Sequence, residues 1–164
     1  MCLTAKNDDG LAKLLETFNT QDSLVYGIGN VGREDDGLGW AFVDWIEENA
    51  LCLEAELVRS YQLHLEDADL ISHKKKVLFI DASKKEEIET FKLSKVEAKM
   101  DVSFTSHAIS VPSVLAICIQ CFDTIPEVYL LEIKGYAWEL KIGLTPQAMQ
   151  NLEDVIANLD TIRV

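Results

Sequence analysis

The sequence predicts an α/β fold: one three-layer domain with a mainly parallel, twisted sheet of about five strands and helices on both faces. Short apolar runs at residues 24–28, 77–80 and 128–133 are typical of strands that are buried on both faces. Amphipathic helical patterns alternate with these runs, and 164 residues suffice for one sizeable core. We therefore expect a single domain over residues 1–164, in which residues 1–22 are an N-terminal extension.

The remaining elements follow from local periodicity and capping signals. Leu38, Phe42 and Ile46 recur at helical spacing after the glycine-rich turn, and Pro146 after Thr145 is typical of a helix start. Expected in chain order are a short helix before residue 21, strands 24–28 and 54–59, a short helix 66–71, strand 77–80, an edge strand or hairpin within 90–100, a buried helix from about residue 110, strand 128–133 and a last helix from residue 146.

Charge and hydropathy limit the partners. The net charge is −13, and the basic runs at 74–76 and 84–85 are short, which argues against nonspecific nucleic-acid binding. The N-terminus lacks a signal-peptide pattern, and the longest apolar run, 109–122, is too short and interrupted to span a bilayer. We expect a cytoplasmic monomer without nucleic-acid or membrane partners.

The four cysteines are expected to be thiols in the cytosol. Cys118 and Cys121 form a C-x-x-C pair, but they lie in an apolar pattern without a second pair nearby. Core packing is therefore the preferred interpretation over a redox or zinc site.

A glycine-rich turn follows the first core strand. Gly27, Gly29 and Gly32 satisfy G-x-G-x-x-G, the spacing of dinucleotide sites, in which a helix N-terminus faces a pyrophosphate. A lone match of this kind is weak, and the residues that come next oppose it.

Three acids occupy the place where such a site would hold phosphate. Glu34, Asp35 and Asp36 are offset only by Arg33, so they would repel an anion. They suit a cation or acid–base chemistry. The competing interpretation is that Asp35 or Asp36 simply caps the following helix.

Two more residues have chemistry-bearing positions. Asp81 directly follows the apolar run 77–80, and carboxyl ends of central strands face the ligand crevice of open α/β sheets. A cap of the next turn is the alternative. His107 lies on a Ser/Thr-rich loop before a buried helix, where a hydrogen-bonded structural histidine is the alternative to a ligand.

The motif Gly27-Ile28-Gly29-Asn30, four residues, then residues 35–39 (DDGLG), resembles the opening signature of the hydrogenase maturation endopeptidases. These enzymes trim a C-terminal peptide from the large subunit of nickel–iron hydrogenases. The Asp81-Ala82 step, the Gln-Leu-x-x-Glu pattern at 62–66 and residues 143–146 (GLTP) are also similar to the family, so the likeness extends from residue 24 to the end.

This resemblance implies a site. Asp36, Asp81 and His107 would be metal ligands, and two carboxylates with one imidazole suit a borderline divalent ion and leave coordination positions open. The partner would be the hydrogenase large-subunit precursor, which delivers nickel; zinc or another divalent ion could act as a surrogate. Cleavage would follow only after nickel insertion.

The cleavage chemistry stays open between a metal-activated water and a general base, Asp36 or Asp81, acting on water. Asp35 would support its neighbour or cap the helix. No Ser/His/Asp or Cys/His signature indicates a covalent nucleophile.

Two other classes of function remain. One is a Rossmann-type nucleotide-binding protein, in which Glu54 or Glu56 would hold a ribose. The other is a non-catalytic metal-binding homologue that keeps the fold.

Overall fold

A six-stranded sheet forms the centre of the computed structural model, which describes residues 2–4, 9–101 and 109–159. The strand order is β1-β5-β6-β4-β2-β3. The four parallel strands are β2 (Ser23–Ile28), β3 (Glu56–Ser60), β4 (Lys76–Ser83) and β6 (Glu127–Lys134); β5 (Phe91–Lys95) is antiparallel to β6, and β1 (Cys2–Thr4) is antiparallel to β5. The mainly parallel sheet is confirmed. Of the six strands, β1 is the one that was not predicted, because three residues show no period.

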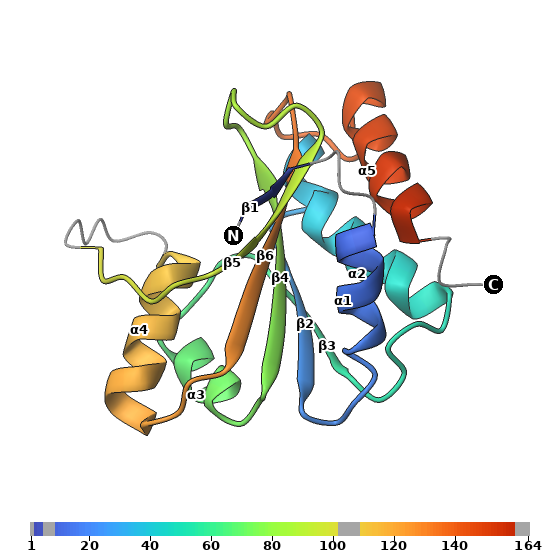
Figure 1. Cartoon of the computed structure of the whole chain (residues 1–164). Coiled ribbons are helices and arrows are strands. Elements are labelled where there is room, and N and C mark those ends of the chain that lie inside the picture. Colours follow the sequence, from blue (N-terminus) through green and yellow to red (C-terminus); the bar gives the residue numbers. More distant parts are fainter. Residues whose placement is uncertain (1, 5–8, 102–108, 160–164) are drawn as a thin grey trace.

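Helices cover both faces of the sheet, so the three-layer prediction is confirmed (Figure 1). One face carries α1 (Asp9–Glu16), α2 (Leu38–Glu48) and α5 (Pro146–Leu159), and the other carries α3 (Glu66–Ser72) and α4 (Val111–Phe122). No described helix is both long and apolar enough to cross a membrane.

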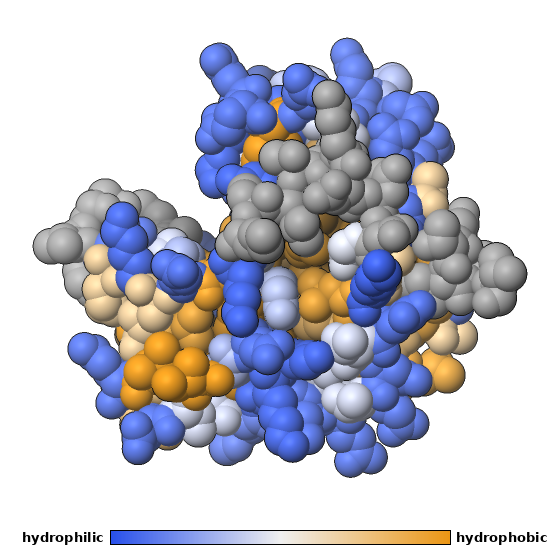
Figure 2. Space-filling view, in the orientation of Figure 1, coloured by the Kyte–Doolittle hydropathy of each residue, from blue (hydrophilic) through white to orange (hydrophobic). Residues whose placement is uncertain are grey.

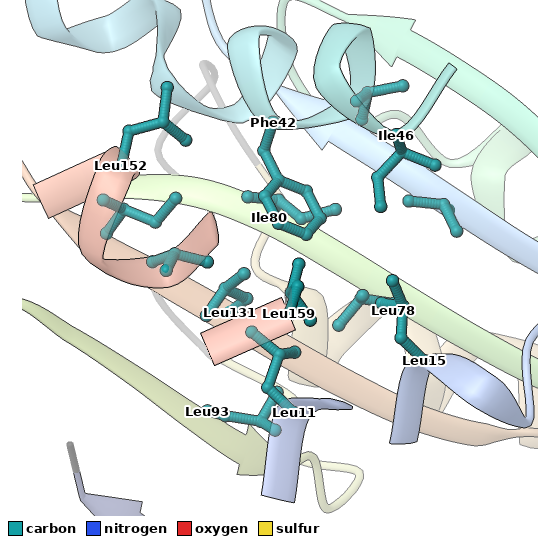
Figure 3. Close-up of a cluster of buried hydrophobic side chains, with 14 of the residues drawn as sticks. Leu11, Leu15, Phe42, Ile46, Leu78, Ile80, Leu93, Leu131, Leu152 and Leu159 are labelled. Carbon is teal, nitrogen blue, oxygen red and sulfur yellow. The ribbon is translucent and has the colours of Figure 1, made fainter. Parts of the chain in front are cut away.

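The larger core lies between the sheet and the helices α1, α2 and α5. Figure 3 shows Leu78 and Ile80 of β4 beneath Phe42 of α2, with leucines of α1 and α5 beside them. Leu11 and Leu15 of α1 are buried in this cluster. The helix α1, which precedes the first core strand β2, therefore forms part of the larger core.

The smaller core lies under α3 and α4. Tyr26 of β2 packs on Phe79 of β4, with ring centroids 5.2 Å apart. The Tyr26 hydroxyl donates to the carboxylate of Asp67 on α3 (3.0 Å), which also accepts from the backbone N–H of His64 (2.7 Å). This buried polar contact fixes α3 and the loop before it to the sheet.

The prediction for the C-x-x-C pair is half right. Cys118 of α4 is fully buried, as expected, but Cys121 of the same helix is exposed. Cys121 lies in the last turn of α4, beside the exposed Phe122, where the helix ends. Figure 2 shows the apolar patch at this lower end of α4, whereas the surface around the upper loops is mostly hydrophilic.

The predicted end of one strand and the predicted sheet position of another are wrong. β4 does not stop at Asp81 but continues to Ser83, because its backbone pairing with β6 persists past the apolar run: Asp81 lies opposite Glu132. The prediction of an edge strand or hairpin within 90–100 is also wrong in its sheet position, since the single strand β5 lies between β1 and β6.

Two glycines let α2 approach the ends of the central strands. A Cβ atom at Gly39 would lie 2.4 Å from the carbonyl oxygen of Ile28 and 2.6 Å from that of Ile80. A Cβ at Gly27 would lie 2.7 Å from the carbonyl oxygen of Gly39. The first turn of α2 therefore rests directly on the backbone of β2 and β4.

We predict that Gly39→Ala lowers the free energy of unfolding by about 2–4 kcal/mol, because backbone atoms cannot yield to the new methyl group. Alanine is the better helix former, so helix propensity alone would stabilise the variant. Urea unfolding measures the change, and Gly32→Ala is the control, because a Cβ there meets only the side-chain oxygen of Asn30 at 3.1 Å. Equal effects of the two substitutions would contradict the close packing.

Candidate active site

The acidic turn joins β2 to α2 at the carboxyl edge of the parallel strands, where α/β sheets bind ligands. Its short 3₁₀ segment is Glu34–Gly37. The backbone N–H of Asn30 donates to the carbonyl of Asp36 (3.1 Å), and the N–H of Asp36 donates to the carbonyl of Arg33 (3.1 Å). Gly29 has φ +141°, and a Cβ there would collide with the Asp36 carbonyl oxygen. The turn thus folds back on itself and places Asp36 over the end of β2.

At this edge Asp36 and Asp81 lie close enough for the charge of Asp36 to act on the Asp81 carboxyl. The pKa of the Asp81 carboxyl is raised to about 7, first by burial and then by the negative charges of Asp36 and Glu132, whereas a hydrogen bond from the backbone N–H of Ala82 lowers it. Burial also raises the pKa of Asp36. Near neutral pH the pair therefore holds a proton readily, and a cation would be an alternative occupant.

Two basic side chains from distant parts of the sequence act on Asp36. The positive charges of Arg33 and Lys84 lower the pKa of Asp36, as does a hydrogen bond from the backbone of Asn30. Arg33 belongs to the acidic turn, and Lys84 directly follows β4. These charges partly offset the burial of the carboxylate.

Asp35 is fully buried and points away from the pair. Its carboxylate accepts hydrogen bonds from the backbone N–H groups of Tyr136 (2.7 Å), Ala137 (3.1 Å) and Thr145 (2.7 Å), and from the Thr145 hydroxyl (2.8 Å). The alternative that Asp35 or Asp36 caps the following helix is wrong, because neither the 3₁₀ segment nor α2 has a side-chain cap. Asp35 instead supports its neighbour by binding the loop 135–145.

Backbone contacts complete the attachment of that loop. The N–H of Glu34 donates to the carbonyl of Lys141 (2.8 Å), and the N–H of Asp35 donates to that of Ala137 (3.1 Å). Glu34 adopts a left-handed conformation, with φ 46°, that costs a non-glycine residue about 1 kcal/mol. The loop holds the acidic turn in this conformation.

Glu132 is a buried acid that the sequence analysis missed. It lies opposite Asp81 on β6, and its carboxylate pairs with the ammonium of Lys85 at 2.7 Å. The only signal was a single acid in the otherwise apolar run 128–133. The ammonium of Lys85 compensates the charge of Glu132, and the two form an ion pair at the border of the site.

His107 lies outside the described residues, so its place relative to the two carboxylates stays a prediction. Within residues 2–4, 9–101 and 109–159, no group of three or more His, Cys, Asp or Glu side chains is arranged to hold a metal ion. His73 is exposed beside its lysines, as expected, and lies 3.4 Å from Asp69.

The two acids that a nucleotide-binding protein would use to hold a ribose, Glu54 and Glu56, lie far from the glycine-rich turn. Glu56 is the first residue of β3, at the amino edge of the sheet, and pairs with Lys74 at 2.9 Å. Glu54 precedes it, on the same side. Both acids are therefore at the end of the sheet opposite the glycine-rich turn, where they cannot reach a ligand bound at that turn.

We predict that Asp35→Asn lowers the free energy of unfolding by about 2–4 kcal/mol, because an amide would leave buried donors without an acceptor. Urea unfolding measures the loss. Asp44→Asn is the matched control: Asp44 is exposed and makes a surface ion pair with Arg59 (2.6 Å), worth about 1 kcal/mol or less. An Asp35→Asn variant as stable as this control would contradict the role of Asp35.

We predict that Asp81→Asn is more stable than the wild type above pH 7. Between pH 3.8 and about 7 the folded protein keeps a proton that unfolded Asp81 has lost, so wild-type stability falls as pH rises through this window. The loss is about 2–4 kcal/mol at pH 8, and asparagine avoids it.

Urea unfolding at pH 4 and at pH 8 tests this sign, with Asp44→Asn as the control. The stability advantage of Asp81→Asn should be present at pH 8 and nearly vanish at pH 4. An advantage that does not depend on pH would show that Asp81 titrates normally in the folded protein.

No family model and no curated protein matches the chain. Among solved structures, the chain is similar to the hydrogenase maturating endopeptidase HybD from Escherichia coli, with 19% identity, 86% of this chain and 91% of that chain covered, and a TM-score of 0.62.

Two archaeal structures are similar as well. The nickel–iron hydrogenase maturation protease HycI from Thermococcus kodakarensis has 15% identity and a TM-score of 0.68, with 93% of this chain and 99% of that chain covered. The hydrogenase 2 maturation peptidase from a Thaumarchaeota archaeon has 20% identity and a TM-score of 0.59, with 85% and 94% covered. The chain therefore has the fold of these maturation proteases over almost its whole length.

Proposed function

We propose that this protein is an endopeptidase that removes the C-terminal peptide of a nickel–iron hydrogenase large-subunit precursor after nickel insertion. The observation that carries the proposal is the meeting of Asp36 and Asp81 at the carboxyl edge of the sheet. The fold shared with proteins named hydrogenase maturation proteases supports it.

In this proposal the nickel ion belongs to the substrate. Asp36 and Asp81 bind the ion that the precursor carries and neutralise part of its charge, and His107 is the proposed third ligand. A precursor without nickel would leave the carboxylates unoccupied, so the enzyme would distinguish nickel-loaded from nickel-free precursor.

The same pair supplies a candidate acid–base group for hydrolysis. A group with a pKa near the operating pH is an effective general base, and while Asp81 is not bound to the ion its pKa of about 7 suits it to accept a proton from water. A water activated by the ion is the other route. The proposed setting is the cytoplasm, with the folded precursor as the partner of a monomeric enzyme.

The decisive experiment mixes the purified protein with nickel-loaded and nickel-free precursor and follows cleavage by mass spectrometry. We expect cleavage of the nickel-loaded form alone. Equal cleavage of both forms would contradict recognition of the ion, and binding without cleavage of either form would favour a non-catalytic metal-binding homologue.

We predict that Asp36→Asn lowers the cleavage rate of nickel-loaded precursor by at least about 100-fold, the scale of loss when a charged group in a catalytic site is removed. Asp44→Asn, on the exposed side of α2, should leave the rate unchanged. An unaffected rate in Asp36→Asn would remove that residue from the site.

A further inference from the structure

Two positive charges lie close to the Asp36 carboxyl. Arg33 and Lys84 are exposed, and among the described residues neither forms an ion pair. Both charges act on the Asp36 carboxyl, so both lie at the same rim.

Trp138 holds both cations. The guanidinium of Arg33 donates from Nη2 to the backbone carbonyl of Trp138 (3.3 Å), and the ammonium of Lys84 lies 4.6 Å from the centre of the Trp138 ring. A cation over an indole face is attracted by the ring and stays open to a second partner on its other side. One residue of the loop 135–145 thus sets the position of both charges.

The backbone around Lys84 is also fixed. Lys134 of β6 donates from Nζ to the carbonyls of Lys84 (3.1 Å) and Lys85 (2.7 Å), and Figure 1 shows the segments after β4 and β6 side by side at the upper end of the sheet. Lys85 turns to Glu132 and is neutralised there. Of these three lysines, Lys84 alone presents its charge at the rim.

We propose that Arg33 and Lys84, held by Trp138, form a subsite for a carboxylate of the peptide that is cut. Guanidinium and ammonium groups that a protein holds in place are the partners that carboxylates prefer, and arginine binds them with two parallel hydrogen bonds. The strongly acidic surface elsewhere would repel an acidic peptide, so these two charges would decide where it docks.

The inference rests on the proposed peptidase function and deepens it. The carboxylate has two sources in a peptide, the C-terminus of the chain and an acidic side chain. Both would contact the same two cations, and the experiment separates them.

The test uses dye-labelled synthetic peptides with the sequence of the precursor's C-terminal segment, in four matched forms. These are the natural peptide, its C-terminal amide, a form with each Asp and Glu replaced by Asn and Gln, and a form with both changes. Fluorescence anisotropy gives the Kd of each without requiring cleavage.

We expect Lys84→Ala and Arg33→Ala each to weaken binding of the natural peptide by about 3–10-fold and to leave the uncharged form unchanged. The single neutralisation that removes this sensitivity identifies the source of the carboxylate. Lys84→Arg should restore binding. In a Trp138→Leu background Lys84→Ala should add little, because the ring that positions Lys84 is gone.

Lys95→Ala is the control, because Lys95 is an exposed lysine at the end of β5 that lies opposite Tyr129, away from the carboxyl edge of the parallel strands. Equal wild-type affinity for the natural and uncharged peptides, or an absence of binding, would overturn the subsite. A loss in Lys84→Ala that is the same for all four peptides would also overturn it, because it would show that Lys84 acts only on Asp36.

Failure of the two proposals gives different results. If wild-type protein binds acidic peptides selectively but never cleaves the nickel-loaded precursor, the subsite stands and the peptidase function is wrong. If the precursor is cleaved at wild-type rate by Arg33→Ala and Lys84→Ala and no peptide shows charge selectivity, the function stands and the subsite is wrong.

Discussion

The buried carboxylate of Asp35 is the constraint on which the candidate site depends. It accepts four hydrogen bonds from residues 136–145, more than 100 positions later in the chain. Because a buried charge must be matched by donors, this contact forms only when the turn and the loop meet in one geometry. Its neighbour Asp36 then faces Asp81, and Trp138 comes to the rim. One buried acid thus organises a site that it does not itself line.

The arrangement concentrates negative charge where the protein gains no stability from it. Asp36, Asp81 and Glu132 crowd the carboxyl edge, and within the part of the chain that the structure describes only Glu132 forms an ion pair. A raised pKa at Asp81 means that the folded state resists the ionised form. Such strain is a feature of sites kept for binding or chemistry rather than for stability. A divalent cation would relieve it.

Much of the fold could be predicted, because local apolar runs such as 77–80 indicate buried parallel strands. The spacing of Leu38, Phe42 and Ile46 in the same way indicates a helix. The strand β1 and the extension of β4 past Asp81 could not, because both depend on backbone pairing with strands distant in sequence. The polar side chain of Asp81 suggested that the strand ends there, but the backbone hydrogen bonds between β4 and β6 continue to Ser83.

The site was predictable in part for the same reason. The meeting of Asp36 and Asp81 followed from topology, since both lie near carboxyl ends of adjacent parallel strands. The separate roles of Asp35 and Asp36 could not be read from two identical neighbours, whose difference lies in which one reaches the loop 135–145. The places of Trp138 and Lys84 depend on contacts between segments far apart, which no local pattern encodes.

The central claim is that Asp36 and Asp81 bind nickel that the precursor carries. Nickel K-edge X-ray absorption of the nickel-loaded precursor, alone and with the enzyme, tests it most directly. The account predicts new oxygen ligands at nickel on addition of the wild-type enzyme, in a complex frozen before cleavage, and none with the double variant Asp36→Asn, Asp81→Asn. An unchanged nickel spectrum in a complex shown to be formed would contradict it.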